Sequence, residues 1–235
     1  MDNLTRLQTY LSQHFLNTTQ LAHNLAISVA QCEQAMAAGL FPAPSYVATD
    51  GCLHSVVFGQ FEVPGLTPNI YVHRDLQPWM QSALNLLLKY EIPVAKALLE
   101  QEFKRDFGQA LQHLHTHCWP MPDAFQEDGS VHQSGLEVRC QRAWEYFCNG
   151  TFGVCVTHPT SAQAIAEKEI LQEKLMYLIE QHNEQHDPST CSPEAVQSIL
   201  SLIPHYEEIC MPFSHLEYPL SSRKKLDDFA EQFDR

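Results

Sequence analysis

The chain has 235 residues, a hydrophobic fraction of 44% and a formal net charge of −14. It is long enough to bury a full core, as one large domain or two smaller ones. The negative charge repels nucleic acid and anionic lipid headgroups, so it disfavours both as partners. No apolar run approaches the about 18 residues that span a bilayer, and Met1 to Thr5 lacks a signal core, which predicts a cytoplasmic protein.

The first 47 residues predict three short helices. Apolar residues of the first helix repeat at helical spacing, at Leu4, Leu7, Leu11 and Phe15. Two polar pairs are typical of capping boxes, namely Asn17 with Gln20 and Ser28 with Gln31. These pairs predict helices over Thr18 to Leu25 and Val29 to Ala38, and Gly39 with the prolines after it ends the third helix.

The next segment, Ser45 to Tyr71, is rich in β-branched and aromatic residues with glycine and proline between them. Ser55 to Phe58 and Phe61 to Val63 therefore predict a small hairpin or wing. Helical patterns then follow to the end of the chain, over Pro78 to Tyr90, Pro93 to His117, Leu136 to Phe147, Ser161 to His186 and Arg223 to Phe233. The second of these helices has a predicted break near Phe107-Gly108. A further helix begins at Pro193 and is predicted to end at Pro204. Thr151 to Val156 is apolar and predicts a turn into a buried segment.

These patterns predict a mainly α protein in two parts. Residues 1–77 form a winged helix-turn-helix-like region with a small β wing, and residues 78–235 form a larger helical domain. The eight cysteines contain no CxxC pair, which favours reduced, mostly buried thiols over a disulfide framework or a zinc site.

Three N-terminal segments carry a resemblance to the MerR-type regulators, a winged helix-turn-helix family that binds DNA. They are Thr18 to Ala22, Ala38 to Pro44 and Tyr71 to Leu76. The resemblance implies that the second helix of the unit, Val29 to Ala38, enters the major groove. That helix has no cation, and Met1 to His73 contains only one basic residue, Arg6, whereas specific binders neutralise about 6–10 phosphates. We therefore expect a scaffold for packing or protein contact and no binding of nucleic acid.

Histidines spaced four residues apart suggest metal ligands at two places. His113 and His117 share one helix face, although a third ligand from elsewhere is needed. The alternative is a solvent-facing helix end, where histidine complements the negative C-terminal dipole. His182 and His186 repeat the spacing at the end of a polar helix, where an exposed end is the favoured interpretation.

Two further segments combine polar, aromatic and ionisable residues as a small-molecule pocket does. The first contains Trp144, Thr151, Cys155 and His158, in which the thiol and imidazole suggest a nucleophile and base, against the alternative of a buried structural cysteine. The second is irregular and contains His215, Glu217, Tyr218 and Arg223, against the alternative of a surface helix whose cations offset acidity.

Motifs in these segments are similar to those of an uncharacterised bacterial domain-of-unknown-function family. They are Gly39 to Tyr46, Gly150 to Cys155 and Met211 to Arg223. Members of that family are sometimes labelled natural-product biosynthesis proteins, so the resemblance implies a pathway context. It implies no reaction, cofactor or catalytic residue.

Two functions stay open from the sequence. The first is an enzyme or small-molecule-binding accessory protein of specialised metabolism, with its site where Trp144 to Cys155 meets Met211 to Arg223. The second is a non-catalytic interaction or regulatory protein, acting as a homodimer or with another partner, in which the acidic helix-turn-helix region presents an apolar surface on Val29 to Ala38.

Overall fold

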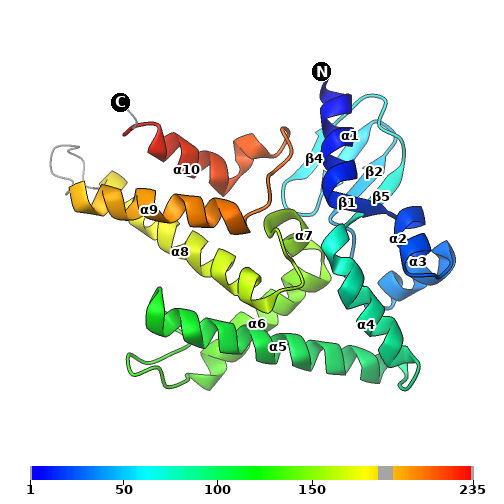
Figure 1. Ribbon diagram of the computed structural model, residues 1–235, viewed down its shortest axis with the longest axis horizontal. Helices are drawn as coiled ribbons and strands as arrows, with labels where there is room; N and C mark the ends of the chain where they lie inside the picture. Colours follow the sequence, from blue (N-terminus) through cyan, green and yellow to red (C-terminus); the bar gives the residue numbers. More distant parts are fainter. Residues whose placement is uncertain (1, 185–192, 234–235) are drawn as a thin grey trace.

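The computed structural model describes residues 2–184 and 193–233. It is mainly helical with one small antiparallel sheet (Figure 1). The helices are α1 (Asn3–His14), α2 (Thr18–Asn24), α3 (Val29–Ala37), α4 (Gln77–Leu87), α5 (Ile92–His117), α6 (Gln133–Cys148), α7 (Thr151–Cys155), α8 (Ala162–Glu184), α9 (Pro193–Ile209) and α10 (Ser222–Ala230). The strands are β1 (Phe15–Asn17), β2 (Tyr46–Thr49), β3 (Cys52–Ser55), β4 (Gly59–Glu62) and β5 (Asn69–His73).

Local signals placed most helix starts correctly. Both capping boxes form, at the N-termini of α2 and α3, and the Ser221 hydroxyl caps α10 by accepting from the Lys224 N–H at 3.2 Å. Two predicted helix ends were wrong. Pro204 lies inside α9, and α5 continues without a break through Phe107 and Gly108.

The five strands form one sheet in the order β1-β5-β2-β3-β4. Phe15, predicted as part of the first helix, instead begins β1 and pairs with His73. The predicted hairpin is also displaced: Val56 to Phe58 form the turn, and the paired strands flank it, because Gly59 adopts the left-handed backbone (φ 81°) needed to reverse the chain.

One hydrophobic core extends across residue 77, the boundary predicted between the two parts of the chain. It joins Leu7 and Val72 on one side to Phe107 and Phe152 on the other. A smaller core packs α8, α9 and α10 together. Within the described ranges, no helix combines the length and apolarity that a bilayer span requires.

Close backbone contacts join α7 to the segment that leads into β2. Gly150 has a φ of 86°, and a Cβ there would lie 2.5 Å from the carbonyl oxygen of Ala43. A Cβ on Gly153 would lie 2.3 Å from Ser45 Oγ, which donates a hydrogen bond to the Gly150 carbonyl at 2.9 Å. Glycine at both positions therefore permits the sheet and the helices to pack directly.

The chain after α7 also pairs with the chain after α9. Val156 and Cys210 form an antiparallel bridge, the Met211 N–H donates to the Cys155 carbonyl at 3.2 Å, and the Thr157 N–H donates to the Ile209 carbonyl at 3.0 Å. This pairing brings segments more than 50 residues apart to one place, beside the end of β5.

Candidate functional site

A cleft of about 370 Å³ opens where α1, the end of β5, the α7–α8 connection, α9 and α10 meet. We call it the His–Arg cleft. It is lined by His14, His73, Arg74, Asp75, Thr157, His158, Glu207, Glu208, Cys210, Met211, Pro212 and Arg223. Eight of these side chains are histidine, arginine or carboxylate groups, so the cleft gathers ionisable groups from five separate parts of the sequence.

The central contact of the cleft joins His158 to Asp75. His158 Nδ1 lies 2.9 Å from Asp75 Oδ2, although the two residues are 83 positions apart. A neutral imidazole that donates its Nδ1 proton to the carboxylate keeps a lone pair on Nε2. The His158 side chain is 69% exposed, so solvent or a ligand can reach the ring. This arrangement orients an imidazole for proton transfer.

His73 has the opposite tautomer, with its proton on Nε2. Its Nδ1 accepts the backbone N–H of Asp75 at 3.2 Å, so the proton of the neutral ring sits on Nε2. Burial lowers the pKa of His73 to about 4, despite the opposing effect of the Asp75 carboxylate. His73 therefore stays neutral at pH 7, with the proton on its Nε2 available as a donor.

The two arginines of the cleft are held by specific partners. Arg74 donates to the carbonyl of Ser12 at 2.8 Å, at the end of α1. Arg223, in the first turn of α10, donates to Glu207 of α9 at 3.2 Å. Burial, reinforced by the Arg74 charge, lowers the pKa of His14. Two guanidinium groups and three carboxylates thus line the same cleft.

Cys210 lines the cleft, and Cys155 is joined to the neighbouring lining residue Met211 by the backbone hydrogen bond described above; both cysteines are buried. Burial raises the pKa of the Cys155 thiol to about 11, and it also raises the pKa of Cys210. Thiols with raised pKa values are weak nucleophiles at neutral pH. The seven cysteines of the described residues are all free, as the alternative of reduced structural thiols predicts.

Glu217 belongs to a different place, a closed polar cluster between the sheet and the segment that joins α9 to α10. We call it the Glu217 cluster. Its carboxylate is fully buried and accepts hydrogen bonds from Tyr46 at 2.8 Å, Ser55 at 2.7 Å and Ser214 at 2.8 Å. Tyr10 lies 3.3 Å from the Tyr46 hydroxyl. Burial raises the pKa of Glu217, although the three hydroxyl bonds oppose that shift.

The other sequence-predicted site residues are dispersed. Trp144 packs in an aromatic core cluster with Trp79, Phe103 and Phe147. Thr151 bonds to the side chain of Asn149 at 2.7 Å, at the start of α7.

Two more of them lie on the segment between α9 and α10. His215 is half-buried, and burial followed by the Arg6 charge lowers its pKa. Tyr218 contacts Asp227 at 2.5 Å, and that carboxylate raises the pKa of the phenol to about 12. The structure thus brings His158 and Arg223 together in the cleft, whereas Trp144, Thr151, His215, Glu217 and Tyr218 lie elsewhere.

The pocket prediction missed six of the eight ionisable residues of the cleft, namely His14, His73, Arg74, Asp75, Glu207 and Glu208. One signal for three of them was present in the sequence: His73, Arg74 and Asp75 are consecutive ionisable residues that follow the apolar residues Ile70 to Val72. Their partner His158 is distant in sequence, so no local pattern pairs them.

The histidine pair of α5 lies far from the cleft in sequence. The rings of His113 and His117 stack with centroids 4.5 Å apart, and His117 Nδ1 lies 2.9 Å from the carbonyl oxygen of His113. Among residues 2–184 and 193–233, no group of three or more His, Cys, Asp or Glu side chains is arranged to hold a metal ion. Of the second predicted pair, His186 lies outside the described residues.

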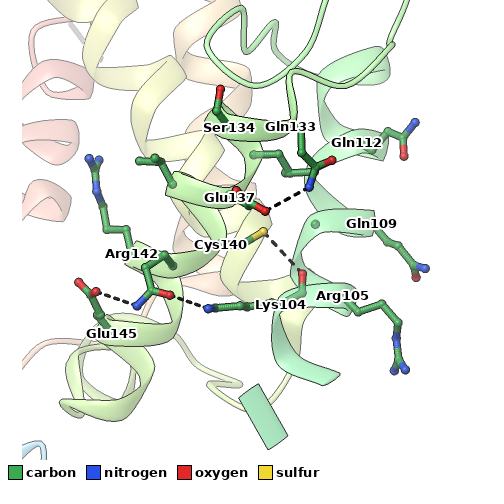
Figure 2. A pocket seen from close by; sticks show the side chains of 14 residues that line it. Lys104, Arg105, Gln109, Gln112, Gln133, Ser134, Glu137, Cys140, Arg142 and Glu145 are labelled. Carbon is green, nitrogen blue, oxygen red and sulfur yellow. Dashed lines mark hydrogen bonds between the residues drawn. The ribbon is translucent and has the colours of Figure 1, made fainter. Parts of the chain in front are cut away.

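A wider hollow of about 970 Å³ lies between α5 and α6 (Figure 2). Its charged and amide groups mostly bond to one another: Lys104 contacts Glu100 and Gln141, and Gln141 donates to Glu145 at 2.9 Å. Figure 2 shows Arg105, Gln109 and Gln112 extending outward from α5, away from α6. The hollow is therefore a surface groove whose side chains do not converge on one point.

A family model matches residues 99–233, more than half of the 235-residue chain. The chain belongs to the DUF6058 family of unknown function. No curated protein and no solved structure matches it. The DUF6058 match includes Thr157, His158 and Arg223 of the cleft, but His73 and Asp75 precede it. The His–Arg cleft is thus built jointly by the DUF6058 region and by the N-terminal residues that pack against it.

Proposed function

We propose that this protein binds a polar small molecule in the His–Arg cleft and that His158 exchanges a proton with it. The observation that carries the proposal is the contact between His158 and Asp75, which orients an exposed imidazole inside a cleft. Histidine is the side chain that acts most often in general acid–base catalysis, and a carboxylate bonded to one ring nitrogen orients the other. The volume of about 370 Å³ lies in the range of small-molecule sites.

The lining groups define the kind of ligand that fits. In its neutral form His158 accepts a hydrogen bond at Nε2, and His73 donates one from Nε2, so a hydroxyl group, which both donates and accepts, complements the pair. Arg74 and Arg223 favour an anionic substituent on the same ligand. The proposed ligand therefore combines a hydroxyl with a carboxylate or phosphate. The resemblance to natural-product biosynthesis proteins leads us to place this activity in bacterial specialised metabolism, in the cytoplasm.

A thermal-shift experiment on the full chain tests the proposal, with hydroxy acids and sugar phosphates as the probes. We expect at least one probe to raise the Tm of the wild type by several degrees, because ligands that bind only the folded state stabilise it. Arg223→Gln and Asp75→Asn should remove most of that increase. Gln109→Ala, on the α5–α6 groove, is the matched control and should retain it.

Two results would count against the proposal. One is a panel in which no probe shifts the Tm of the wild type. The other is a shift that survives both cleft variants or disappears in Gln109→Ala. Carbethoxylation of His158 by diethyl pyrocarbonate, followed by mass spectrometry, adds an independent readout, because a bound probe should protect this exposed imidazole.

A protein-binding function is the second candidate, and the sequence placed its contact surface on α3 of the N-terminal region. On α3, the exposed polar side chains are Gln31, Glu33 and Gln34, and Val29 is the only large apolar side chain exposed in that described helix. This surface offers little to DNA or to an apolar partner. The observation that favours protein binding lies instead at the turn between α4 and α5, where large apolar side chains are exposed.

A further inference from the structure

The turn between α4 and α5 exposes an unusual run of apolar side chains. Every residue from Leu88 to Val94 is exposed. The large apolar side chains of this corner, with their exposed fractions, are Leu88 (83%), Tyr90 (44%), Ile92 (42%), Val94 (47%) and Leu98 (37%). Among the described residues, fifteen large hydrophobic side chains are exposed, and these five fall within eleven consecutive positions. We call residues 88–98 the apolar corner.

Folding of the single chain leaves this apolar surface in water. The buried face of the first turns of α5 is formed by Ala95 and Leu99, whereas Val94 and Leu98 are four residues apart on the exposed side. Exposed apolar side chains that gather in one place typically mark an interaction surface. Figure 1 shows the α4–α5 turn at the outer edge of the molecule, where another molecule can approach it.

The net charge around the apolar corner is positive, whereas the net charge of the whole chain is negative. Between Leu76 and Leu99 the only charged residues are Lys89, Glu91 and Lys96, which sum to +1 in a chain of net charge −14. The residues from 161 to the C-terminus contain six basic and fourteen acidic residues, a net −8. In Figure 1, α9 and α10 lie at the opposite end of the molecule from the α4–α5 turn. Contact through the apolar corner therefore keeps the acidic ends of two copies far apart.

The two charges within the turn complement each other. Lys89 and Glu91 flank Tyr90, both are exposed, and neither side chain has a hydrogen bond or an ion pair within the described residues. A two-fold axis places the same patch against itself, so that residue i meets j and j meets i. Lys89 of each copy can then pair with Glu91 of the other, around an apolar centre.

We propose that the apolar corner is the interface of a two-fold symmetric homodimer. Leu88, Ile92 and Val94 form its apolar centre, and reciprocal Lys89–Glu91 pairs fix its orientation. This interface is independent of the His–Arg cleft, which lies at the junction of the sheet with α9 and α10.

Sedimentation velocity of the untagged full chain over a wide concentration range tests the proposal. We expect the wild type to be a dimer, and the double variant Leu88→Asp/Val94→Asp to raise the dimer Kd at least about tenfold. Val138→Asp is the matched control, because Val138 is 56% exposed on α6 and should leave the dimer unchanged. Circular dichroism checks that each variant keeps the wild-type fold.

Charge exchange gives the sharper test. Lys89→Glu and Glu91→Lys should each weaken self-association, because each places like charges across the two-fold axis. An equimolar mixture of the two variants should restore the dimer as a heterodimer, which a general loss of folding cannot produce. A wild type that is monomeric at every concentration overturns the proposal, and so does a dimer that persists in Leu88→Asp/Val94→Asp. Co-sedimentation of a monomeric wild type with phosphatidylcholine vesicles would assign the corner to a lipid surface instead.

Discussion

The Glu217 cluster and the His–Arg cleft both bring residues of the N-terminal sheet region together with residues that follow α9. They differ in how fully their polar groups are hydrogen-bonded within the protein. In the Glu217 cluster each buried group is bonded: three hydroxyls donate to one carboxylate, and the residues involved are at most 9% exposed. In the cleft, His158 is 69% exposed and has one ring nitrogen directed to Asp75 and the other without a protein partner in the described residues. A closed, fully bonded cluster stabilises the fold, whereas an open and partly bonded one leaves bonding capacity for a ligand.

Removing the carboxylate of the Glu217 cluster should have the largest effect on stability. We expect Glu217→Ala to lower the free energy of unfolding by about 4 kcal/mol, because three buried hydroxyls lose their acceptor. Glu207→Ala, which breaks the partly exposed pair with Arg223 at the cleft, should cost less than about 1 kcal/mol. Chemical denaturation at pH 7 measures both. Equal losses would remove the distinction between the closed cluster and the open cleft.

Acid should destabilise the protein through His73, the most buried imidazole of the cleft. The folded-state pKa of about 4 lies below the ordinary 6.5, so the unfolded chain binds more protons between these pH values. The free energy of unfolding therefore includes the full contribution of neutral His73 above pH 6.5. That contribution is lost as the pH falls towards 4, by at most about 3 kcal/mol. Glu217, whose pKa is raised, acts with the opposite sign.

The comparison of wild type with His73→Gln isolates this contribution. Urea denaturation at several pH values between 4 and 7 should give a steeper fall in stability for the wild type than for the variant. Parallel pH profiles would show that His73 does not titrate on unfolding as its burial requires.

Single hydroxyl deletions should have smaller effects than removal of the Glu217 carboxylate and still distinguish the two places. Ser55→Ala removes one donor to Glu217 and should cost about 1–2 kcal/mol. Thr157→Ala at the cleft should change stability by less than about 0.5 kcal/mol, because its hydroxyl makes one 3.4 Å bond to an exposed segment. A cost for Thr157→Ala as large as that for Ser55→Ala would indicate that the cleft is a structural element.

Local chemistry explains which parts of the fold could be predicted. The capping boxes at Asn17 and Ser28 act within four residues, so the sequence alone locates α2 and α3. The predicted end of α9 at Pro204 was wrong because packing against α8 and α10 stabilises the helix beyond the hydrogen bond that proline removes. Phe15 follows the helical repeat of α1, but pairing with His73 at the edge of the sheet places it in β1.

The candidate site was only partly visible for the same reason. Gly150 to Cys155 and Met211 to Arg223 stood out as unusual segments, and their neighbours Val156 and Cys210 pair in the structure. The sequence did not reveal that Glu217 is buried, because an ionisable residue in an irregular segment is normally predicted to be exposed. Its three hydroxyl partners come from β2, β3 and its own segment.

The sequence by itself determined the mainly helical class, the helix starts marked by caps, the negative net charge and the free thiols of the described residues. Each of these follows from composition or from contacts within one helical turn. Only the tertiary structure decided that Asp75 meets His158, that Glu217 is buried, and that the α4–α5 turn leaves its apolar side chains exposed. Those outcomes depend on which distant surfaces pack together, and a helical repeat gives the spacing of apolar residues but not the partner that covers them.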